Sequence, residues 1–211
     1  MKVLLAVPAA TGIMPQTDEA IHRIIRRTYD ERGVWPDLKI EANYEVAHAR
    51  NRLAKIAMDG GYDYVFFMDD DVVPNDDALL NLLEHDVDVC LGYYVHRSRS
   101  KGEERKTNLC KLGEHSFTDQ YGRDELRKLR ENGQKLIRVH GGGLGCSLVK
   151  TSVFERISWP YFRWYIYGQD GYGILSEDLY FDVKCEKVGI PIHADTRVSC
   201  GHMLRYVQEA D

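Results

Sequence analysis

Tyr64-Val-Phe-Phe-Met-Asp-Asp-Asp-Val-Val-Pro74 is the stretch of this 211-residue sequence that decides its fold. Its first half is continuously apolar and rich in Phe and Val, which predicts a short strand buried on both faces. Three carboxylates follow at once, and because like charges repel, we expect another group to neutralise them. Side chains alternate across a strand, so Asp69 and Asp71 are expected on one side and Asp70 on the other. Such a pair predicts a Mg²⁺ or Mn²⁺ site, and the alternative is a polar loop whose acids cap a helix.

The composition is ordinary for a soluble globular protein, with 44% hydrophobic and 29% charged residues. A chain of this length can bury a real core, which predicts a single domain. The net charge of -5 argues against a nucleic-acid partner or an anionic membrane, because both need a basic face. Two basic runs, at 97–101 and 123–135, are interpreted as solvated surface.

The sequence contains no apolar segment long enough for a transmembrane span, and the apolar run near its start is too short for a signal-peptide core. The cysteines are odd in number and show no CxxC pairing, which favours a reducing compartment over a disulfide framework or zinc cluster. We therefore predict a cytoplasmic protein, in the host cytoplasm if the source is viral. The five cysteines are Cys90, Cys110, Cys146, Cys185 and Cys200.

The first sixty residues predict strands and helices in alternation. Residues 3–7 form an apolar strand that we expect Pro8 to stop, and Thr17-Asp-Glu is expected to open a helix as a capping box. A second strand is predicted at 38–42 and a second helix at 45–58. This β-α-β order implies a parallel sheet with a crossover helix.

Arg50 lies in the middle of the apolar stripe of the second predicted helix. A buried charge without a partner is very costly, so this arginine needs an anion or must extend to solvent. The candidate partners are a structural acid, a substrate phosphate and a carboxylate of the Asp69–Asp71 cluster. The stripe consists of Val46, Ala49, Leu53, Ile56 and Ala57.

The middle of the chain is less regular. Asn75-Asp-Asp is expected to cap a helix, and a strand is predicted at 87–91. Residues 95–134 are expected to be irregular apart from a helix at 124–131. Strands at 136–139 and 145–149 are predicted to flank the segment His140-Gly-Gly-Gly-Leu-Gly145, where glycines allow a backbone to approach a ligand closely or to turn sharply.

The last fifty residues combine aromatic, acidic and histidine motifs. The aromatic segment 159–167 precedes a glycine-rich segment at 168–173, which suits either core packing or a sugar platform with a mobile flap. Ser176-Glu-Asp opens a helix that Gly189 closes, so its acids are either capping residues or catalytic groups. A final strand at 192–198 leads to His202, which is either structural or a ligand.

Taken together, these motifs resemble the GT-A fold of nucleotide-sugar glycosyltransferases, particularly the large family-2-like group. The resemblance spans most of the chain, and compact stand-alone domains of this kind occur in bacteria and large viruses. It implies an α/β fold, a Rossmann-like α/β/α sandwich around a mixed, mostly parallel sheet. It also implies one domain over 1–211, with a nucleotide-binding half at about 1–94 and a donor-sugar and acceptor half at about 135–211. The resemblance rests on the Val7-Pro8 strand end, Ala49-Arg-Asn51, Phe67 to Pro74, Gly141 to Ser147, Ser176 to Asp182 and Gly201-His202.

The resemblance also implies roles for individual residues. Asp69, Asp71 and His202 match a metal site for Mn²⁺ or Mg²⁺, with Asp71 the direct ligand and Asp69 reaching the ribose or the metal. Asp178 matches the general base of inverting members, and Glu177 a contact to donor or acceptor hydroxyls. The positions that match nucleotide-sugar contacts are Pro8, Ala9, Ala10, Thr11, Arg50, Asp69, Asp70, Gly142 and Gly143.

The activity implied is metal-dependent transfer of a sugar from a UDP-sugar to a hydroxyl of a glycan or glycoprotein. A divalent cation stabilises the charge that grows on the departing diphosphate, and a carboxylate on the other side of the sugar removes the acceptor proton. The second predicted strand has no obvious acid for the uracil, and Glu41 and Asn43 are the candidates. Inverting and retaining chemistry both stay open, because retaining members also carry acids at the position of Asp178.

Three alternatives fit parts of the pattern. Asp69-x-Asp71-x-Val73 also fits the motif of haloacid-dehalogenase-type phosphatases, in which the first Asp is a phosphoryl-accepting nucleophile. That family places its motif on an early strand, whereas two predicted βα units precede it here. A sugar-1-phosphate nucleotidyltransferase needs a basic loop after the first strand, and residues 9–15 contain no basic residue. A sugar-nucleotide-binding module without turnover is the third alternative.

Overall fold

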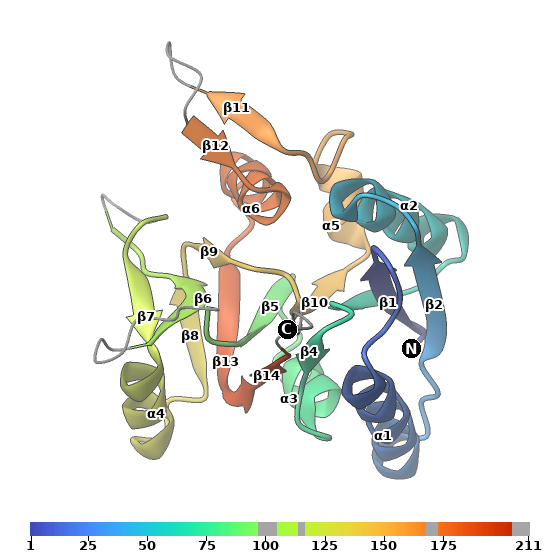
Figure 1. Cartoon of the computed structure of the whole chain (residues 1–211). Helices are drawn as coiled ribbons and strands as arrows, with labels where there is room; N and C mark the ends of the chain where they lie inside the picture. The colour runs from blue at the N-terminus through green and yellow to red at the C-terminus, as the bar shows by residue number, and fades with distance from the viewer. Residues whose placement is uncertain (97–104, 114–116, 168–172, 204–211) are drawn as a thin grey trace, which may run out of the picture.

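The computed structural model describes residues 1–96, 105–113, 117–167 and 173–203, which form an α/β fold (Figure 1). The basic run at 97–101 and residues 168–172 of the expected flap lie outside the described residues. Among the helices that are described, none is long and apolar enough to cross a membrane.

A seven-stranded sheet forms the centre of the molecule, with the strand order β2-β1-β3-β10-β5-β13-β8. β10 pairs antiparallel with both of its neighbours and β8 pairs antiparallel with β13, whereas the other five strands share one direction. The prediction of a mixed, mostly parallel sheet is therefore confirmed. The seven strands are β1 (Val3–Ala9), β2 (Asp37–Ala42), β3 (Tyr64–Met68), β5 (Val89–Tyr93), β8 (Leu136–Val139), β10 (Cys146–Lys150) and β13 (Ile192–Ser199).

Helices cover both faces of this sheet, as in an α/β/α sandwich (Figure 1). One apolar core contains the buried side chains of α1 and α3, and a second core contains those of α2, α4, α5 and α6. The burial of β3 on both faces follows, since Phe66 belongs to the first core and Phe67 to the second. The helices are α1 (Pro15–Arg32), α2 (Val46–Asp59), α3 (Ala78–Glu84), α4 (Arg123–Glu131), α5 (Ser152–Arg156) and α6 (Glu177–Lys187).

Within the described residues, seven short strands make three small sheets beside the main one. The expectation that residues 95–134 are irregular apart from a helix is wrong, because β6 and β7 form there and pair with each other. Polar side chains stabilise these strands: buried Thr107 donates to the carbonyl of Tyr121, and buried Asn108 donates to that of Gly143. The short strands are β4 (Val72–Val73), β6 (Lys106–Cys110), β7 (Gln120–Gly122), β9 (Gly141–Gly142), β11 (Tyr165–Tyr167), β12 (Gly173–Leu175) and β14 (Gly201–His202).

Two predicted boundaries in the first βα unit are also wrong. β1 does not stop before Pro8 but continues to Ala9. The pairing of β1 with β3 ends at Ala6, so no hydrogen bond to β3 is lost because Pro8 has no N–H. α1 begins at Pro15 rather than at Thr17, since proline fits the first helical position, where its lack of an N–H costs nothing. Thr17 is consequently buried inside the helix.

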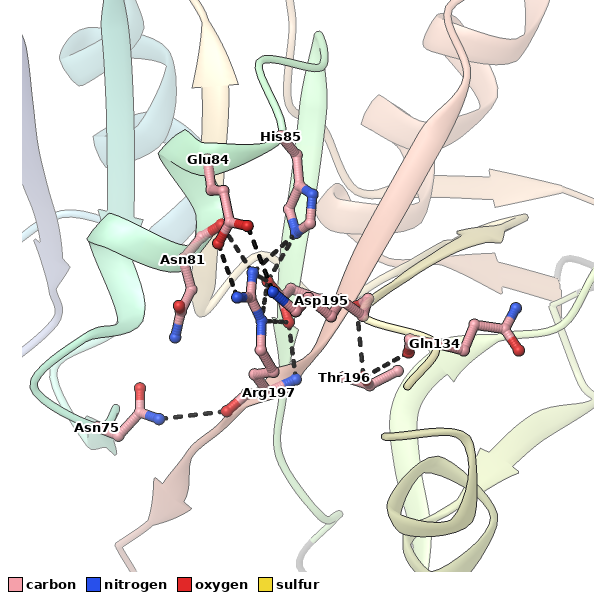
Figure 2. A network of polar contacts seen from close by, with 9 residues as sticks. Asn75, Asn81, Glu84, His85, Gln134, Asp195, Thr196 and Arg197 are labelled. Carbon is pink, nitrogen blue, oxygen red and sulfur yellow. Dashed lines mark hydrogen bonds and ion pairs between the residues drawn. The ribbon is translucent and has the colours of Figure 1, made fainter. Parts of the chain in front are cut away.

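A polar network fastens the second half of β13 to α3 (Figure 2). The pairing of β13 with β5 changes register between Ala194 and Ser199, and Arg197 lies in this gap. Its guanidinium binds fully buried Asp195 at 2.6 Å and Glu84 of α3 at 2.7 Å. This clamp fixes the path of the chain from β13 into β14.

Candidate active site

Arg50 is the centre of the candidate site. Its side chain is only 1% exposed, and it reaches from α2 to one carboxylate directly after β3 and to two in the first turn of α6. One terminal nitrogen donates to Asp69 at 2.7 Å, and the other donates to Glu177 at 2.7 Å and also to Asp178. The partner expected from the aspartate cluster is therefore present, and the acids of α6 are bound to the same guanidinium.

The three aspartates lie in a turn and do not continue the extended strand β3. β3 ends at Met68, and the amide of Val72 donates back to the carbonyl of Asp69. Strand alternation therefore does not set their directions: Asp69 turns to Arg50, whereas a carboxylate oxygen of Asp71 lies 3.6 Å from Nε2 of His202. His202 reaches this position because β14 pairs with β4 directly after the aspartates.

A cavity of about 430 Å³ opens at this end of the sheet. Four of the predicted nucleotide-sugar contacts line it, together with both residues of the Asp71–His202 pair. Ala9 is instead buried in the core and Thr11 is exposed, and neither lines the cavity. The lining residues are Pro8, Ala10, Val46, Asp69, Asp70, Asp71, Tyr94, His96 and His202.

A larger cavity, of about 590 Å³, involves Asp63 and Tyr64 at the opposite end of β3. It contains none of the predicted site residues, so its size does not make it the better candidate.

Residues 19–158 match the model of glycosyl transferase family 2, which covers well over half of the chain and includes β3, the three aspartates and Arg50. The chain belongs to glycosyl transferase family 2. Family membership makes the domain a glycosyltransferase by class, implies a nucleotide-sugar donor and leaves the phosphatase and nucleotidyltransferase alternatives without support.

Solved structures agree with this fold assignment. A197 from STIV aligns with a TM-score of 0.63 over 97% of this chain and 87% of that protein. The identity is 19%, so this likeness shows the fold alone. A search of curated proteins found no match.

Asp71 and His202 are two of the residues predicted to hold the divalent metal that is typical of the family. Within the described residues, no three His, Cys, Asp or Glu side chains form a group that could hold a metal ion. Asp71 and His202 nevertheless converge on the cavity. In nucleotide sites, Mg²⁺ is commonly held by one or two protein groups plus phosphate oxygens and water, so this pair fits such an ion. The ring of His202 is held against Tyr94, with ring centroids 5.0 Å apart.

Asp178 lies in the first turn of α6, which Ser176 caps by accepting from the amide of Leu179. Burial raises the pKa of Asp178 to about 7; Arg50 opposes this rise, and the neighbouring charges of Glu177 and Asp69 add to it. A carboxyl group with a pKa near 7 is suited to accept a proton at neutral pH.

Asp182, which was not among the predicted site residues, lies one helical turn after Asp178 and is fully buried. Its carboxyl group accepts from the amide of Gly142 at 2.8 Å and fills the space where a Cβ of Gly141 would lie. Burial raises the pKa of Asp182 well above its ordinary value. Its spacing of four residues from Asp178 is the signal that would have placed both acids on the same side of the helix.

Tyr94 is a second site residue that was not predicted from the sequence. It lines the cavity, and its hydroxyl occupies the space beside Gly143, where a Cβ would lie 2.2 Å away. Burial raises the pKa of Tyr94 well above its ordinary value. Gly142 and Gly143, predicted to pass the donor sugar, are thus held between Asp182 and the cavity wall.

The candidates for uracil recognition lie at the end of β2. Glu41 is buried and bound by Arg52 at 2.7 Å, and Arg52 also lies over the ring of Tyr44. Asn43 adopts a positive φ of 64° and donates its amide to the carbonyl of Ala9. These contacts fix the loop that follows β2 beside the loop that follows β1.

Proposed function

We propose that this domain transfers a sugar from a UDP-sugar to a hydroxyl group of a glycan or glycoprotein, with Mn²⁺ or Mg²⁺ as cofactor. The observation that carries the proposal is the buried Arg50 cluster. It binds Asp69, which belongs to the D-x-D motif and lines the cavity, and both acids of the Glu177–Asp178 pair. Groups suited to the donor and to the acceptor are thereby drawn together.

The donor would occupy the cavity, with its nucleoside toward Pro8 and Ala10 and its diphosphate toward the aspartates. Asp71 and His202 would hold the cation, and Asp69 would reach the ribose or the metal. The cation would supply Lewis-acid stabilisation of the departing diphosphate. The chain's own contribution is to fix these groups before the donor arrives, since β14 and β4 are already paired.

Asp178 would accept the proton of the acceptor hydroxyl as the new glycosidic bond forms. Arg50 holds its carboxylate in place, while burial and, to a smaller extent, the negative charges of Glu177 and Asp69 raise its pKa and keep its affinity for a proton high. Glu177 would contact a hydroxyl of donor or acceptor. This role for Asp178 favours inversion at the anomeric carbon, and analysis of the product anomer by NMR tests it.

The segment that contains Gly142 and Gly143 would lie beside the donor sugar, and Asp182 would set the position of this segment. Because Asp182 and Asp178 belong to the same helix, the bond from Asp182 to Gly142 fixes the distance between the donor-sugar segment and the general base. No side chain larger than glycine fits at position 141 without moving this carboxyl group.

Calorimetric titration with UDP in the presence and absence of MnCl₂ tests the proposal. We expect binding that requires Mn²⁺, and that Asp71→Ala weakens it at least about tenfold because one of two protein ligands is lost. Asp76→Ala is the matched control, since Asp76 is an exposed acid paired with Arg23 outside the cavity. A folded wild-type sample that binds neither UDP nor UDP with Mn²⁺ refutes the proposal.

A screen of nucleotide sugars for release of the free nucleotide identifies the donor. We expect one UDP-sugar to be cleaved faster than the corresponding ADP- and GDP-sugars. Preference for a different nucleotide would keep the glycosyltransferase class and overturn the choice of uridine.

A further inference from the structure

The segment that follows α5 is fastened to α2 by the side chain of Asn51. This amide is buried, and its oxygen accepts from the backbone amides of Tyr161 at 2.9 Å and Phe162 at 3.2 Å. Its nitrogen donates to the carbonyl of Phe162 at 2.7 Å and to that of Ala47 at 2.8 Å. The backbone that leads into β11 therefore has a fixed place beside the first turns of α2.

Trp164 makes the second connection between this segment and α2. Its indole N–H donates to the carboxylate of Glu45 at 2.8 Å. The same carboxylate caps α2 by accepting from the amides of Ala47 and His48. The only polar atom of the indole is thus satisfied, yet 49% of the residue stays exposed, so its remaining free surface is apolar ring.

Through Glu45, Trp164 is attached to the end of α2 that contacts both the donor cavity and the candidate general base. Val46, which follows Glu45, lines the cavity, and Arg50 is one helical turn further along the same side of α2. Arg50 in turn holds Asp178. The chain that leaves Trp164 forms the β11–β12 hairpin, which returns to the start of α6 (Figure 1).

We propose that Trp164 forms one wall of an acceptor subsite, where its ring packs against the face of an acceptor sugar. This inference rests on the proposed function, because it assumes that Asp178 deprotonates an acceptor hydroxyl. The C–H face of a pyranose is apolar and matches an aromatic ring, while the sugar hydroxyls stay available to carboxylates such as Glu177. A tryptophan needed only for packing would be buried, whereas this one is fixed by a hydrogen bond and open to solvent.

A carbohydrate acceptor fits this position better than a membrane does. The most exposed apolar side chains of the hairpin, Ile166 and Ile174, face each other across its two strands. They would be the residues that enter a lipid surface. Trp164 is instead held by the carboxylate of Glu45, the residue before Val46, which lines the cavity.

Single-tryptophan variants test the subsite directly, because the chain contains three tryptophans. W35F/W159F leaves Trp164 as the sole tryptophan, and W35F/W164F leaves Trp159, which is 61% exposed and contacts Tyr161. Each is titrated, with UDP and MnCl₂ present, with the methyl glycosides of glucose, galactose, mannose and N-acetylglucosamine. We expect a saturable change in the emission of Trp164 with at least one glycoside and none from Trp159. No saturable change from Trp164, or an equal change from both, overturns the proposal.

Kinetics with the glycoside selected in this way provide the second test. W164A is expected to raise the KM for the acceptor about tenfold and the KM for the donor less than about twofold. W164F keeps a ring but loses the bond to Glu45, so its acceptor KM should lie between those of W164A and the wild type. W159A is the matched control and should change neither constant. Equal rises in both KM values for W164A would assign Trp164 a structural role and refute the subsite.

Two further results separate the possible failures. If the wild type binds no UDP with Mn²⁺, the proposed function itself has failed. If UDP binds normally but I166S/I174S, rather than W164A, loses activity on a vesicle-bound acceptor, the hairpin contacts lipid and the carbohydrate subsite is wrong.

Discussion

Replacing Arg50 by methionine tests the central cluster most sharply. Methionine is similar in length and apolar, so it fills much of the same space but supplies no charge. The three carboxylates that share the guanidinium would then face one another, and Glu177 is only 7% exposed at its side chain. We expect the variant to fold with a much lower free energy of unfolding at neutral pH.

The size of the loss follows from the geometry. At a separation of 2.7 Å and an effective dielectric constant of ~20, each ion contact is worth roughly 6 kcal/mol before desolvation is counted. Desolvation of the buried guanidinium offsets most of that gain. Removal of one partner from a buried ion cluster typically costs about 3–5 kcal/mol, because it leaves uncompensated charge behind. For a chain of this size the melting temperature should fall by roughly 6–20 °C.

The pH dependence of the loss has a definite sign. The pKa of Asp178 is about 7 in the folded protein, above its ordinary value of 3.8, so the folded state binds this proton more tightly. The contribution of Asp178 to stability is therefore greatest below about pH 4 and decreases as the pH rises through about 7. Arg50 lowers this pKa, so its removal extends the loss to higher pH. The variant should be closer to the wild type at pH 5 than at pH 8.

Urea unfolding followed by circular dichroism at pH 5 and pH 8 measures both effects. Lys55→Met is the matched control, because Lys55 is also on α2 but its side chain is 62% exposed and pairs with the equally exposed Asp59. This control should lose much less stability than Arg50→Met. An Arg50→Met protein as stable as the wild type at pH 8, or equally destabilised at both pH values, would refute the assignment of Arg50 as the buried counter-ion.

Two further predictions concern the acids of α6. The rate of sugar transfer should rise with pH up to about 7 and then level off, because Asp178 must be deprotonated to accept a proton. Asp178→Asn should remove this pH dependence together with most of the activity. A flat pH profile in the wild type contradicts the general-base role. Gly141→Ala should lose about 1–3 kcal/mol of stability, because the added Cβ would lie 2.2 Å from the buried carboxyl oxygen of Asp182. Gly201→Ala is the control for thermal unfolding, since the added Cβ would lie 3.6 Å from the nearest atoms of Val73. Equal melting temperatures for the two variants would show that the space beside Asp182 can adapt.

Much of the fold could be predicted from local patterns. The apolar run of β3, the amphipathic stripe of α2 and the capping Ser176 of α6 each act over a few residues, so sequence spacing alone identifies them. β6 and β7 were not predicted, because their buried polar side chains, such as Thr107 and Asn108, find hydrogen-bond partners only in the folded chain. No apolar alternation marks them in the sequence.

The candidate site divides in the same way. The sequence indicated Asp69, Asp71, Asp178 and His202 by residue type and order, and it showed that Arg50 needed an anionic partner. It could not show that one guanidinium binds acids 19 and 128 positions away, because contacts at such separation depend on how the sheet is assembled.

The sequence by itself determined the alternation of the main strands and helices, the family-2-like motifs and the residues with suitable chemistry, since these depend on periodicity and composition. Only the tertiary structure decided where those residues point. β3 ends before Asp69, so a turn rather than strand alternation directs Asp69 to Arg50 and Asp71 to His202. The insertion of β10 between β3 and β5, and the pairing of β14 with β4, then bring the last third of the chain to the aspartates. Long-range pairing of this kind leaves no local pattern, because the free energy that favours it arises from burial shared among distant segments.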